Sequence, residues 1–486
     1  MPCECNFAGL LTSRLSETSS LVDAATGQAL VGSELSSLIV GFASGFLSAG
    51  LQPGDRLLVS CTQSPASTLA YLGAMYAGIV PVPVEEQVLA ISGNCLAVKS
   101  RARALWTANG TSNEVKSGVN IRHIEGSFGP CSPDSLEPFH SIEGDLAALM
   151  PTSGSTGMPQ LVMVTHGNLE SNTEAIIRSQ RLRRGETAML VMPISYCFGA
   201  SVMHTHLYQG GSVVFDSRFM FPDRVLHAIN TYHCSTFAGV PFIYLTLLRR
   251  SNLKSIPLPQ LLRFLQAGGP LNAQCIRELR SIVPNAEFFV MYGQTEATAR
   301  ISCLPPDRLS HKLGSAGLPL DNLEVRIADE NGRALPRGLV GEIQVRGPSV
   351  CSGYFDDPES TQRKYSDGWL KTGDAASVDS EGYLWIHGRR DEFVKIRGRR
   401  VGVTEVESTI GTVAGVTECA AVSVYHAEQG DSLAILVVAD DSEDSVKERI
   451  RHAIPSHWKG AVVKFVAALP KTANGKIARC QLATLL

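Results

Sequence analysis

The chain has 486 residues, which at about 150 residues per domain predicts about three structural units. Apolar residues make up 44% of the chain and charged residues 18%, a composition that excludes an intrinsically disordered protein. The 43 Lys and Arg residues are balanced by 46 Asp and Glu residues, so the net charge of −3 disfavours general binding to a nucleic-acid backbone.

Cysteine usage and the N-terminus indicate where the protein resides. The 12 cysteines are scattered without repeated CxxC pairs, which fits reduced thiols better than a disulfide framework. The N-terminal segment 1–10 lacks a basic stretch before an apolar core, so no signal peptide is expected. The uncharged stretch 37–51 is shorter than the roughly 20 residues of a membrane span, and 187–215 is interrupted by proline and glycine. We therefore expect a cytoplasmic protein without a membrane span.

Short apolar strands alternate with helices through the first half of the chain. Residues 54–61 predict a strand, 64–78 a helix and 79–84 a second strand. The same alternation returns further on, with predicted strands at 188–193, 211–215 and 235–240 and predicted helices at 200–209 and 222–231. Strands separated by helical segments are typical of βαβ units and mostly parallel sheets.

The pattern changes around residue 314. Short strands at 323–329 and 341–347, punctuated by Gly and Pro, predict a small antiparallel or β-barrel-like module at about 314–385. A mixed α+β tail follows from about residue 391. We expect an α/β fold: a large N-terminal domain, residues 1–390, with two mostly parallel α/β sheet subdomains and the barrel-like module, and then a small C-terminal domain, residues 391–486.

A loop rich in hydroxyls and glycine lies between two apolar runs, and consists of Thr152, Ser153, Gly154, Ser155, Thr156 and Gly157. Glycine allows backbone N–H groups to face an anion, and hydroxyls donate further hydrogen bonds without adding bulk. The loop contains neither a Walker A motif nor a GxGxxG fingerprint. By itself it fits a phosphate-binding loop and a plain turn between two hairpin strands equally well.

Three further segments carry chemistry that suits a nucleotide. Tyr292 and Glu296, in the segment 291–297, offer an aromatic face for adenine and a carboxylate for Mg²⁺, although Glu296 alone also fits a helix start. Asp374 suits ribose hydroxyls or an ordinary Asx turn. Lys476 follows a glycine near the chain end and alone would be a solvated lysine.

Taken together, the motifs at 152–166, 292–296, 368–374, 388–398 and 470–479 resemble, in order and spacing, those of the adenylate-forming ligases. This superfamily includes acyl-CoA and aryl-CoA synthetases, nonribosomal peptide adenylation domains and luciferases. The likeness extends from about residue 30 to residue 486. It implies an AMP-forming acid–thiol ligase that converts a carboxylic acid and ATP to an acyl-adenylate and pyrophosphate, and then transfers the acyl group.

The resemblance also implies roles for single residues. Loop 152–157 would hold the β- and γ-phosphates, Tyr292 would stack on adenine, and the ATP site would further include Gly268, Gly269, Gly293, Asp374 on the ribose and Arg389 nearby. Thr295 would touch the α-phosphate, Glu296 would hold Mg²⁺, and Lys476 would bridge the carboxylate and the α-phosphate. Asp391 would be the hinge of a mobile C-terminal domain, and Gly398 would line the channel for the thiol of CoA or phosphopantetheine.

Gln160 departs from the family pattern, which places a lysine at this position of the loop. The substitution removes a cation expected near the pyrophosphate. It predicts weaker binding of ATP or pyrophosphate, and not an inactive protein.

The resemblance places the acyl pocket at Tyr196, Cys197, Phe198, Gly199, Ala238, Gly239 and Ala267. Amino-acid-activating relatives have an Asp in the first of these segments, which pairs with the α-ammonium of the substrate. This chain has no acid there, and an unpaired ammonium would be costly. We therefore expect an uncharged aryl or medium- or long-chain acyl carboxylate and not an α-amino acid, although plain core packing also explains the small residues.

The acceptor and two minor motifs leave alternatives open. The expected acceptor is the thiol of CoA or of a carrier protein; an amide synthetase that uses an amine, or a catalytically weak acyl-nucleotide sensor, are the alternatives. His204 and His206 form an HxH pair without an evident third metal ligand, so we expect core or surface histidines. Cys3 and Cys5 are expected to be free thiols.

Overall fold

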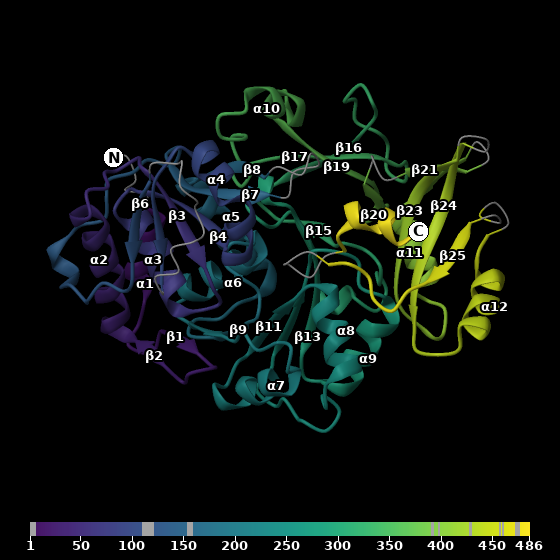
Figure 1. Cartoon of the computed structure of the whole chain (residues 1–486), viewed down its shortest axis with the longest axis horizontal. Coiled ribbons are helices and arrows are strands. Elements are labelled where there is room, and N and C mark those ends of the chain that lie inside the picture. The colour runs from purple at the N-terminus through teal and green to yellow at the C-terminus, as the bar shows by residue number, and fades with distance from the viewer. Residues whose placement is uncertain are drawn as a thin grey trace.

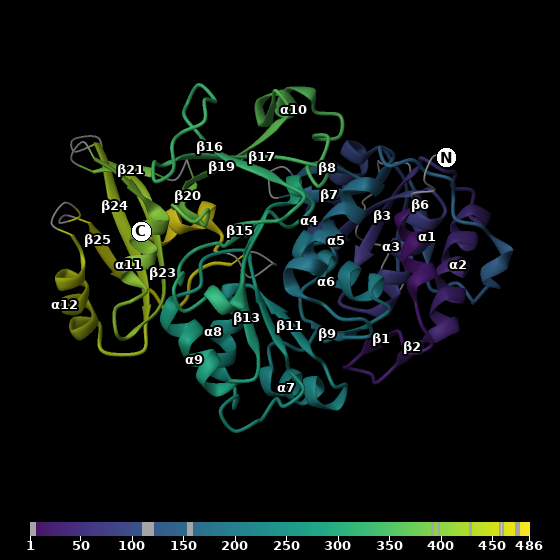
Figure 2. The same ribbon diagram turned by 180° about the vertical axis from the view of Figure 1, so that it is seen from behind.

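The structure is a computed structural model that describes residues 6–108, 121–152, 159–389, 393–396, 399–426, 430–455, 458, 461–471 and 477–486. The N-terminal elements lie at one end of the molecule and the C-terminal elements at the other (Figures 1 and 2). Most strands of the nine-stranded sheet, and the small antiparallel sheet, lie between them.

The largest sheet has nine strands, whose central six run parallel. In spatial order they are β15 (Leu318–Pro319), β14 (Ser302–Leu304), β13 (Glu287–Tyr292), β12 (Arg263–Gln266), β11 (Thr236–Gly239), β9 (Thr187–Leu190), β10 (Ser212–Phe215), β1 (Ser20–Asp23) and β2 (Ala29–Val31). Antiparallel pairs occur only at its edges, among these described strands. The helices that connect or pack along it are α5 (His166–Gln180), α6 (Cys197–Tyr208), α7 (Pro222–Thr231), α8 (Pro241–Arg250) and α9 (Ala273–Ile282).

A second sheet is wholly parallel, in the order β4 (Val80–Glu85), β3 (Arg56–Cys61), β5 (Ala102–Thr107) and β6 (Arg122–Glu125). Helices α3 (Pro65–Tyr76) and α4 (Glu86–Ser100) pack on its strands. Helices α1 (Phe7–Arg14) and α2 (Gly32–Ser48) pack on α3, and the 3₁₀ turn η1 (Pro133–Ser135) packs on α2. The two parallel sheets confirm the predicted α/β class. The described part of the chain contains no helix long and apolar enough to cross a membrane; the uncharged stretch 37–51 instead contributes to α2, which packs on α3.

Strands β7 (Leu146–Thr152) and β8 (Gln160–Thr165) form an antiparallel hairpin that follows the second sheet along the chain. The antiparallel module follows with β16 (Glu324–Ala328), β17 (Gly341–Arg346), α10 (Pro358–Lys364), β18 (Tyr365–Ser366), β19 (Trp369–Val378) and β20 (Leu384–Arg389), preceded by the 3₁₀ turns η2 (Thr295–Ala297) and η3 (Pro306–Arg308). Residues 318–319 were expected in this module, but they pair with β14 at the edge of the large sheet.

The C-terminal part contains β21 (Phe393–Ile396), β22 (Arg399–Gly402), α11 (Val403–Ile410), β23 (Val416–His426), β24 (Gly430–Ala439), α12 (Glu443–Ala453), β25 (Val462–Phe465) and the 3₁₀ segment η5 (Arg479–Leu485). Strands β23, β24 and β25 form a sheet with its own apolar core. The predicted boundary after residue 390 falls among residues 390–392, which lie outside the described ranges. That boundary stays a prediction.

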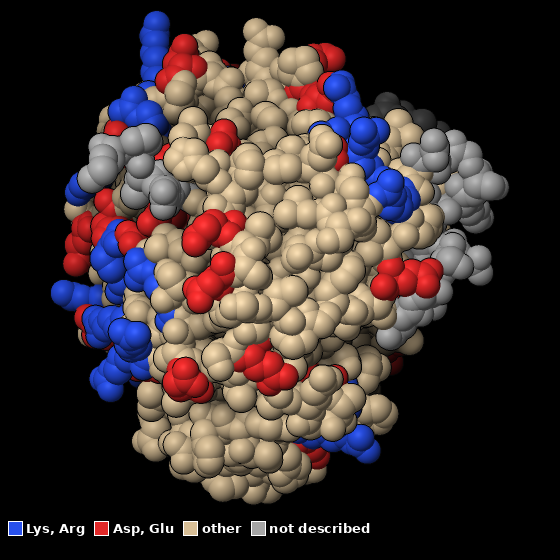
Figure 3. Space-filling model, turned by 90° about the vertical axis from the view of Figure 1, so that its left-hand side faces the viewer, with Lys and Arg blue, Asp and Glu red and all other residues tan. Residues whose placement is uncertain are grey.

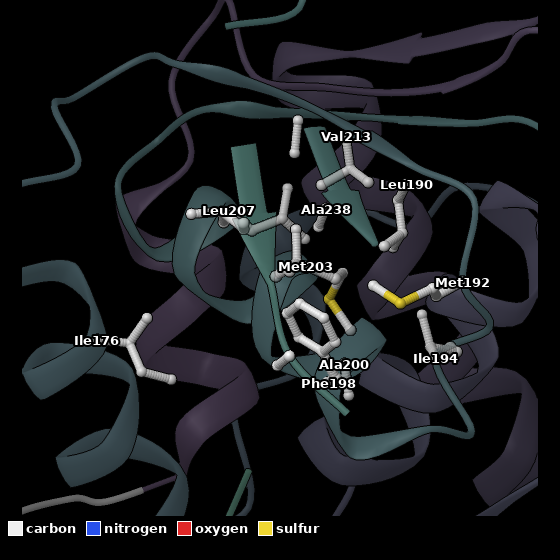
Figure 4. Close-up of a cluster of buried hydrophobic side chains, with 14 of the residues drawn as sticks. Ile176, Leu190, Met192, Ile194, Phe198, Ala200, Met203, Leu207, Val213 and Ala238 are labelled. Atoms are coloured by element: carbon white, nitrogen blue, oxygen red, sulfur yellow. The ribbon is translucent and has the colours of Figure 1, made fainter. Parts of the chain in front are cut away.

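The main core surrounds α6, which is buried along nearly its whole length because β9 and β10 cover it with apolar side chains. Figure 4 shows Met203 and Phe198 of this helix among Leu190, Met192 and Ile194. The core therefore holds α6 rigidly, and the N-terminus of α6 carries the predicted pocket residues 197–199.

In Figure 3 the centre of the surface at the N-terminal end of the molecule is mostly uncharged, with Asp and Glu side chains scattered over it. Lys and Arg lie toward its margins, mixed with Asp and Glu. The described residues of this face therefore form no continuous basic surface, in keeping with the near-zero net charge of the chain.

Candidate active site

A tyrosine and an aspartate that lie 82 residues apart in sequence meet where β13 ends beside β19. The Tyr292 hydroxyl donates to Asp374 Oδ2 at 2.5 Å, and Arg389 Nη1 lies 3.4 Å from Asp374 Oδ1. Burial raises the pKa of Asp374, although Arg389 and the Tyr292 hydroxyl oppose this by favouring the ionised carboxylate. The structure thus brings together the residues predicted to hold adenine and ribose.

Glu296 lies in η2, directly after this strand, and is 8% exposed. Its Oε1 accepts a hydrogen bond of 2.6 Å from the Tyr354 hydroxyl. Burial and the neighbouring Glu296 charge raise the pKa of Tyr354, so the phenol stays a donor. One buried carboxylate suits Mg²⁺, which binds proteins through one or two carboxylates and takes its other ligands from water and substrate phosphates.

The backbone after Glu296 is strained. Thr298 and Ala299 have φ values of 51° and 86°, in the left-handed region that non-glycine residues seldom adopt. Gly293 makes this possible, because a Cβ at that position would lie 1.9 Å from the Ala299 carbonyl oxygen. Such strain is often found at functional sites.

Thr295 connects the nucleotide side of the site with the predicted acyl pocket. Its hydroxyl donates to Cys197 Sγ at 3.3 Å, and Cys197 is the first residue of α6. The predicted α-phosphate residue and the predicted acyl pocket are therefore adjacent, as the attack of a carboxylate on the α-phosphorus requires.

Lys364 is a cation that the sequence analysis did not select. It ends α10, and its Nζ donates to the Thr372 carbonyl at 2.9 Å, two residues before Asp374. Burial lowers the pKa of Lys364, whereas the nearby carboxylates of Glu296 and Asp374 favour its charged form. Nothing in the sequence signals this position, because it requires knowledge of how α10 packs on β19. The same holds for Tyr354, whose contact with Glu296 is made only in the fold.

Gln160 begins β8, at the edge of the predicted phosphate loop. Its Nε2 lies 3.5 Å from Asp357 Oδ2, and Lys99 Nζ donates to the neighbouring Pro159 carbonyl at 2.9 Å. Thr152 ends β7 opposite Gln160, so the loop residues Ser153, Gly154, Ser155, Thr156 and Gly157 connect two hairpin strands. These five residues lie outside the described ranges, as do Asp391, Gly398 and Lys476.

Two glycines of the predicted acyl pocket lie where the backbone and a neighbouring side chain pack closely. A Cβ on Gly199 would lie 2.2 Å from the Pro193 carbonyl oxygen, and one on Gly239 would lie 2.8 Å from Ile243 Cγ2. Close packing, the alternative that the sequence left open, therefore explains both glycines, and their place in the acyl pocket stays a prediction. Ala238 and Ala267 are buried at the ends of β11 and β12.

Two other predicted ATP-site glycines follow β12. Gly268 has a φ of 85°, and the Gly269 carbonyl accepts a hydrogen bond of 2.7 Å from Gln266 Nε2. The turn after β12 is thus defined by the left-handed backbone of Gly268 and by the hydrogen bond that Gln266, the last residue of β12, donates to it.

His204 and His206 lie within α6 and not on a strand. Both are buried, and burial lowers their pKa values to about 3 and about 4, so both are neutral. The described residues contain no cluster of three His, Cys, Asp or Glu side chains that could hold a metal ion. Cys3 and Cys5 lie outside the described ranges.

Comparison with known proteins is consistent with this geometry. The family model described as AMP-binding enzyme matches residues 13–355, and the model described as AMP-binding enzyme C-terminal domain matches residues 405–476. A feruloyl-CoA synthase of Amycolatopsis sp is 31% identical over 465 residues, which cover 93% of this chain and 93% of that protein. The 4-coumarate–CoA ligase-like 4 of Oryza sativa subsp. japonica is 31% identical over 512 residues, covering 98% of this chain and 92% of that protein.

Among solved structures, ATP-bound MatB from Rhodopseudomonas palustris matches with a TM-score of 0.89 at 26% identity, covering 100% of this chain and 99% of that chain. The likeness therefore extends over both parts of the fold. The chain belongs to the AMP-binding enzyme family and is an adenylate-forming ligase of the acid–thiol type.

Proposed function

We propose that the protein activates a carboxylic acid other than an α-amino acid with ATP, releases pyrophosphate, and transfers the acyl group to the thiol of CoA. The observation that carries the proposal is that a pair of residues suited to a nucleoside lies next to the predicted acyl pocket. The Tyr292–Asp374 pair suits a nucleoside, and Thr295 links that side of the site to Cys197 in the acyl segment. The names of the two relatives, a feruloyl-CoA synthase and a 4-coumarate–CoA ligase-like protein, favour an aryl acid and CoA.

In the first half-reaction, a carboxylate oxygen attacks the α-phosphorus and pyrophosphate leaves. The protein has to overcome repulsion between the carboxylate and the phosphates. Asp374 would orient the ribose, the Thr295 hydroxyl would contact the α-phosphate, and Lys476 would bridge the two reacting anions. Mg²⁺ would supply charge neutralisation at the phosphate oxygens, and Glu296, oriented by Tyr354, is the residue that would hold it.

We propose that two described cations, Lys364 and Lys99, compensate for the lysine that the family pattern places at residue 160. Lys364 lies beside Glu296 and Asp374, and Lys99 is bonded to the loop residue Pro159. Their charge, together with loop N–H groups and hydroxyls, would keep the protein active in spite of Gln160.

In the second half-reaction, the thiol attacks the acyl carbon and AMP leaves. Asp391 would act as the hinge about which the C-terminal part turns, and Gly398 would then allow a narrow pantetheine arm to pass close to the backbone. The same cleft would thus serve both reactions.

The test is release of pyrophosphate from ATP with a panel of aryl and fatty acids, with CoA, a holo-carrier protein or an amine added in turn. We expect acid-dependent release and a thioester with CoA. Product only with amines would identify an amide synthetase. No turnover with any acid would identify a sensor and contradict the proposal.

A further inference from the structure

Arg300 is a fully buried arginine for which the described residues provide no counter-ion. It follows the strained residues Thr298 and Ala299, is 1% exposed, and ranks among the largest fully buried side chains. Its backbone carbonyl is fixed by a 3.0 Å hydrogen bond from Asn172 Nδ2. The backbone of Arg300 is therefore anchored four residues after the Mg²⁺ candidate Glu296.

The surroundings of this guanidinium leave it unsatisfied. Its Nε and Nη2 atoms are sealed from solvent and donate to no partner in the described part of the protein. The titratable groups that act on its charge are Cys303, Cys197 and Tyr196, none of them a carboxylate, and burial lowers its pKa. A buried charge without a partner is strongly unfavourable, so its presence calls for a ligand.

The position of Arg300 indicates which ligand. Its Cζ lies 4.7 Å from the centre of the Phe198 ring, and Phe198 follows Cys197, which contacts Thr295. The cation–π contact with Phe198 offsets part of the burial cost but uses none of the N–H donors. Arg300 thus lies beside the predicted acyl-pocket residue Phe198, and its Nε and Nη2 donors are unused within the described part of the protein.

We propose that Arg300 is a specificity residue of the acyl pocket, and that the acid activated carries a second carboxylate, which pairs with the free donors of the guanidinium. This inference rests on the proposed function and replaces the expected uncharged acyl group with a dicarboxylic acid. A carboxylate fits because a guanidinium binds it in a bidentate manner and because it neutralises the buried charge.

The test uses acids in matched pairs, hexanoate against adipate and 4-methylbenzoate against terephthalate, with pyrophosphate release as the readout. We expect the wild-type protein to prefer the dicarboxylate in at least one pair. Arg300→Met should lower kcat/KM for that dicarboxylate about 100-fold while changing that of its partner acid by less than about 3-fold. Arg300→Lys should retain part of the preference, and Arg280→Met, on the exposed side of α9, should retain all of it.

Three results would overturn the inference. Equal losses of kcat/KM for both acids of a pair would mean that Arg300 contacts the reacting carboxylate or has a structural role in the core. A wild-type protein that does not prefer dicarboxylates, or one that prefers phenolic acids such as 4-hydroxybenzoate, would contradict the proposal that the substrate carries a second carboxylate.

Two measurements separate this inference from the proposed function. If no acid is turned over, calorimetric binding of adipate and terephthalate to the wild-type and Arg300→Met proteins still decides it, because binding that depends on Arg300 supports the inference and its absence contradicts it. The thermal midpoint of Arg300→Met should equal or exceed that of the wild type, since an unpaired buried charge is removed. A large fall would assign Arg300 a structural role.

Discussion

At the residue scale, the site depends on hydrogen bonds between side chains that are distant in sequence. Tyr292, Glu296 and Asp374 could be selected from the sequence because each lies in a short motif with a recognisable chemistry. Tyr354, the hydrogen-bond partner of Glu296, could not be selected, because this contact arises only when the segment before α10 packs against η2.

The Glu296–Tyr354 pair predicts a graded loss of activity. Glu296→Gln should lower kcat about 100-fold, since it removes the charge that would hold Mg²⁺. Tyr354→Phe should lower it only about 10-fold, because the carboxylate remains but loses the donor that orients it. Steady-state kinetics against Mg²⁺ concentration check both. Tyr365→Phe is the matched control, since the Tyr365 hydroxyl is buried without a partner in the described structure; an equal effect of the two tyrosine variants would contradict the assignment.

Lys364 and Gln160 predict opposite changes in the KM for ATP. Lys364→Met should raise it about 10-fold, because the ammonium next to Glu296 and Asp374 is lost. Gln160→Lys should lower it, and should restore the Lys364→Met protein in part. The exposed Lys447→Met is the control. A Gln160→Lys protein with unchanged KM for ATP and unchanged kcat would contradict the prediction that Gln160 weakens ATP binding.

At the element scale, periodicity was a good guide wherever an element is long and its burial follows from its own sequence. The helix predicted at 222–231 coincides with α7, and the uncharged stretch 187–215 is a strand, a helix and a strand, as predicted. The sequence could not decide between pocket lining and core packing for Gly199, because the approach of the Pro193 carbonyl is a tertiary contact. The pairing of β15 with β14 was missed for the same reason, since a strand of two residues has no periodicity of its own.

Helix α6 predicts an acid-sensitive core. His204 stacks on Tyr71 and meets the edge of Phe7, and its pKa is lowered to about 3 by burial. The unfolded chain takes up a proton near its ordinary pKa of about 6.5 while the folded chain does not, so stability falls as pH decreases below about 6.5. His204→Phe should reduce the slope of unfolding free energy against pH by up to about 1.4 kcal/mol per pH unit.

Urea unfolding at several pH values between about 5 and 7 measures this slope. His227→Phe, in the exposed part of α7, should leave the slope unchanged. A His204→Phe protein with the wild-type slope would mean that His204 is charged in the folded state.

At the scale of the whole molecule, the C-terminal part docks beside α8 and α9. Asn272 Nδ2 donates to the Gly411 carbonyl at 2.5 Å, and Lys471 Nζ lies 3.7 Å from the centre of the Phe242 ring while pairing with Glu418 at 2.8 Å. Lys471 and Ile477 form an antiparallel β-bridge, and Lys476 lies outside the described residues. The described contacts therefore place the C-terminal part against α8 and the turn before α9.

The central claim is that one cleft serves two half-reactions, with Lys476 needed only in the first. The most direct measurement compares Lys476→Ala with the wild type in two assays: formation of acyl-adenylate from acid and ATP, and thioester formation from a preformed acyl-adenylate and CoA. We predict that the substitution lowers the first rate at least about 100-fold and leaves the second within a few-fold of the wild type. Equal losses in both assays would contradict the account.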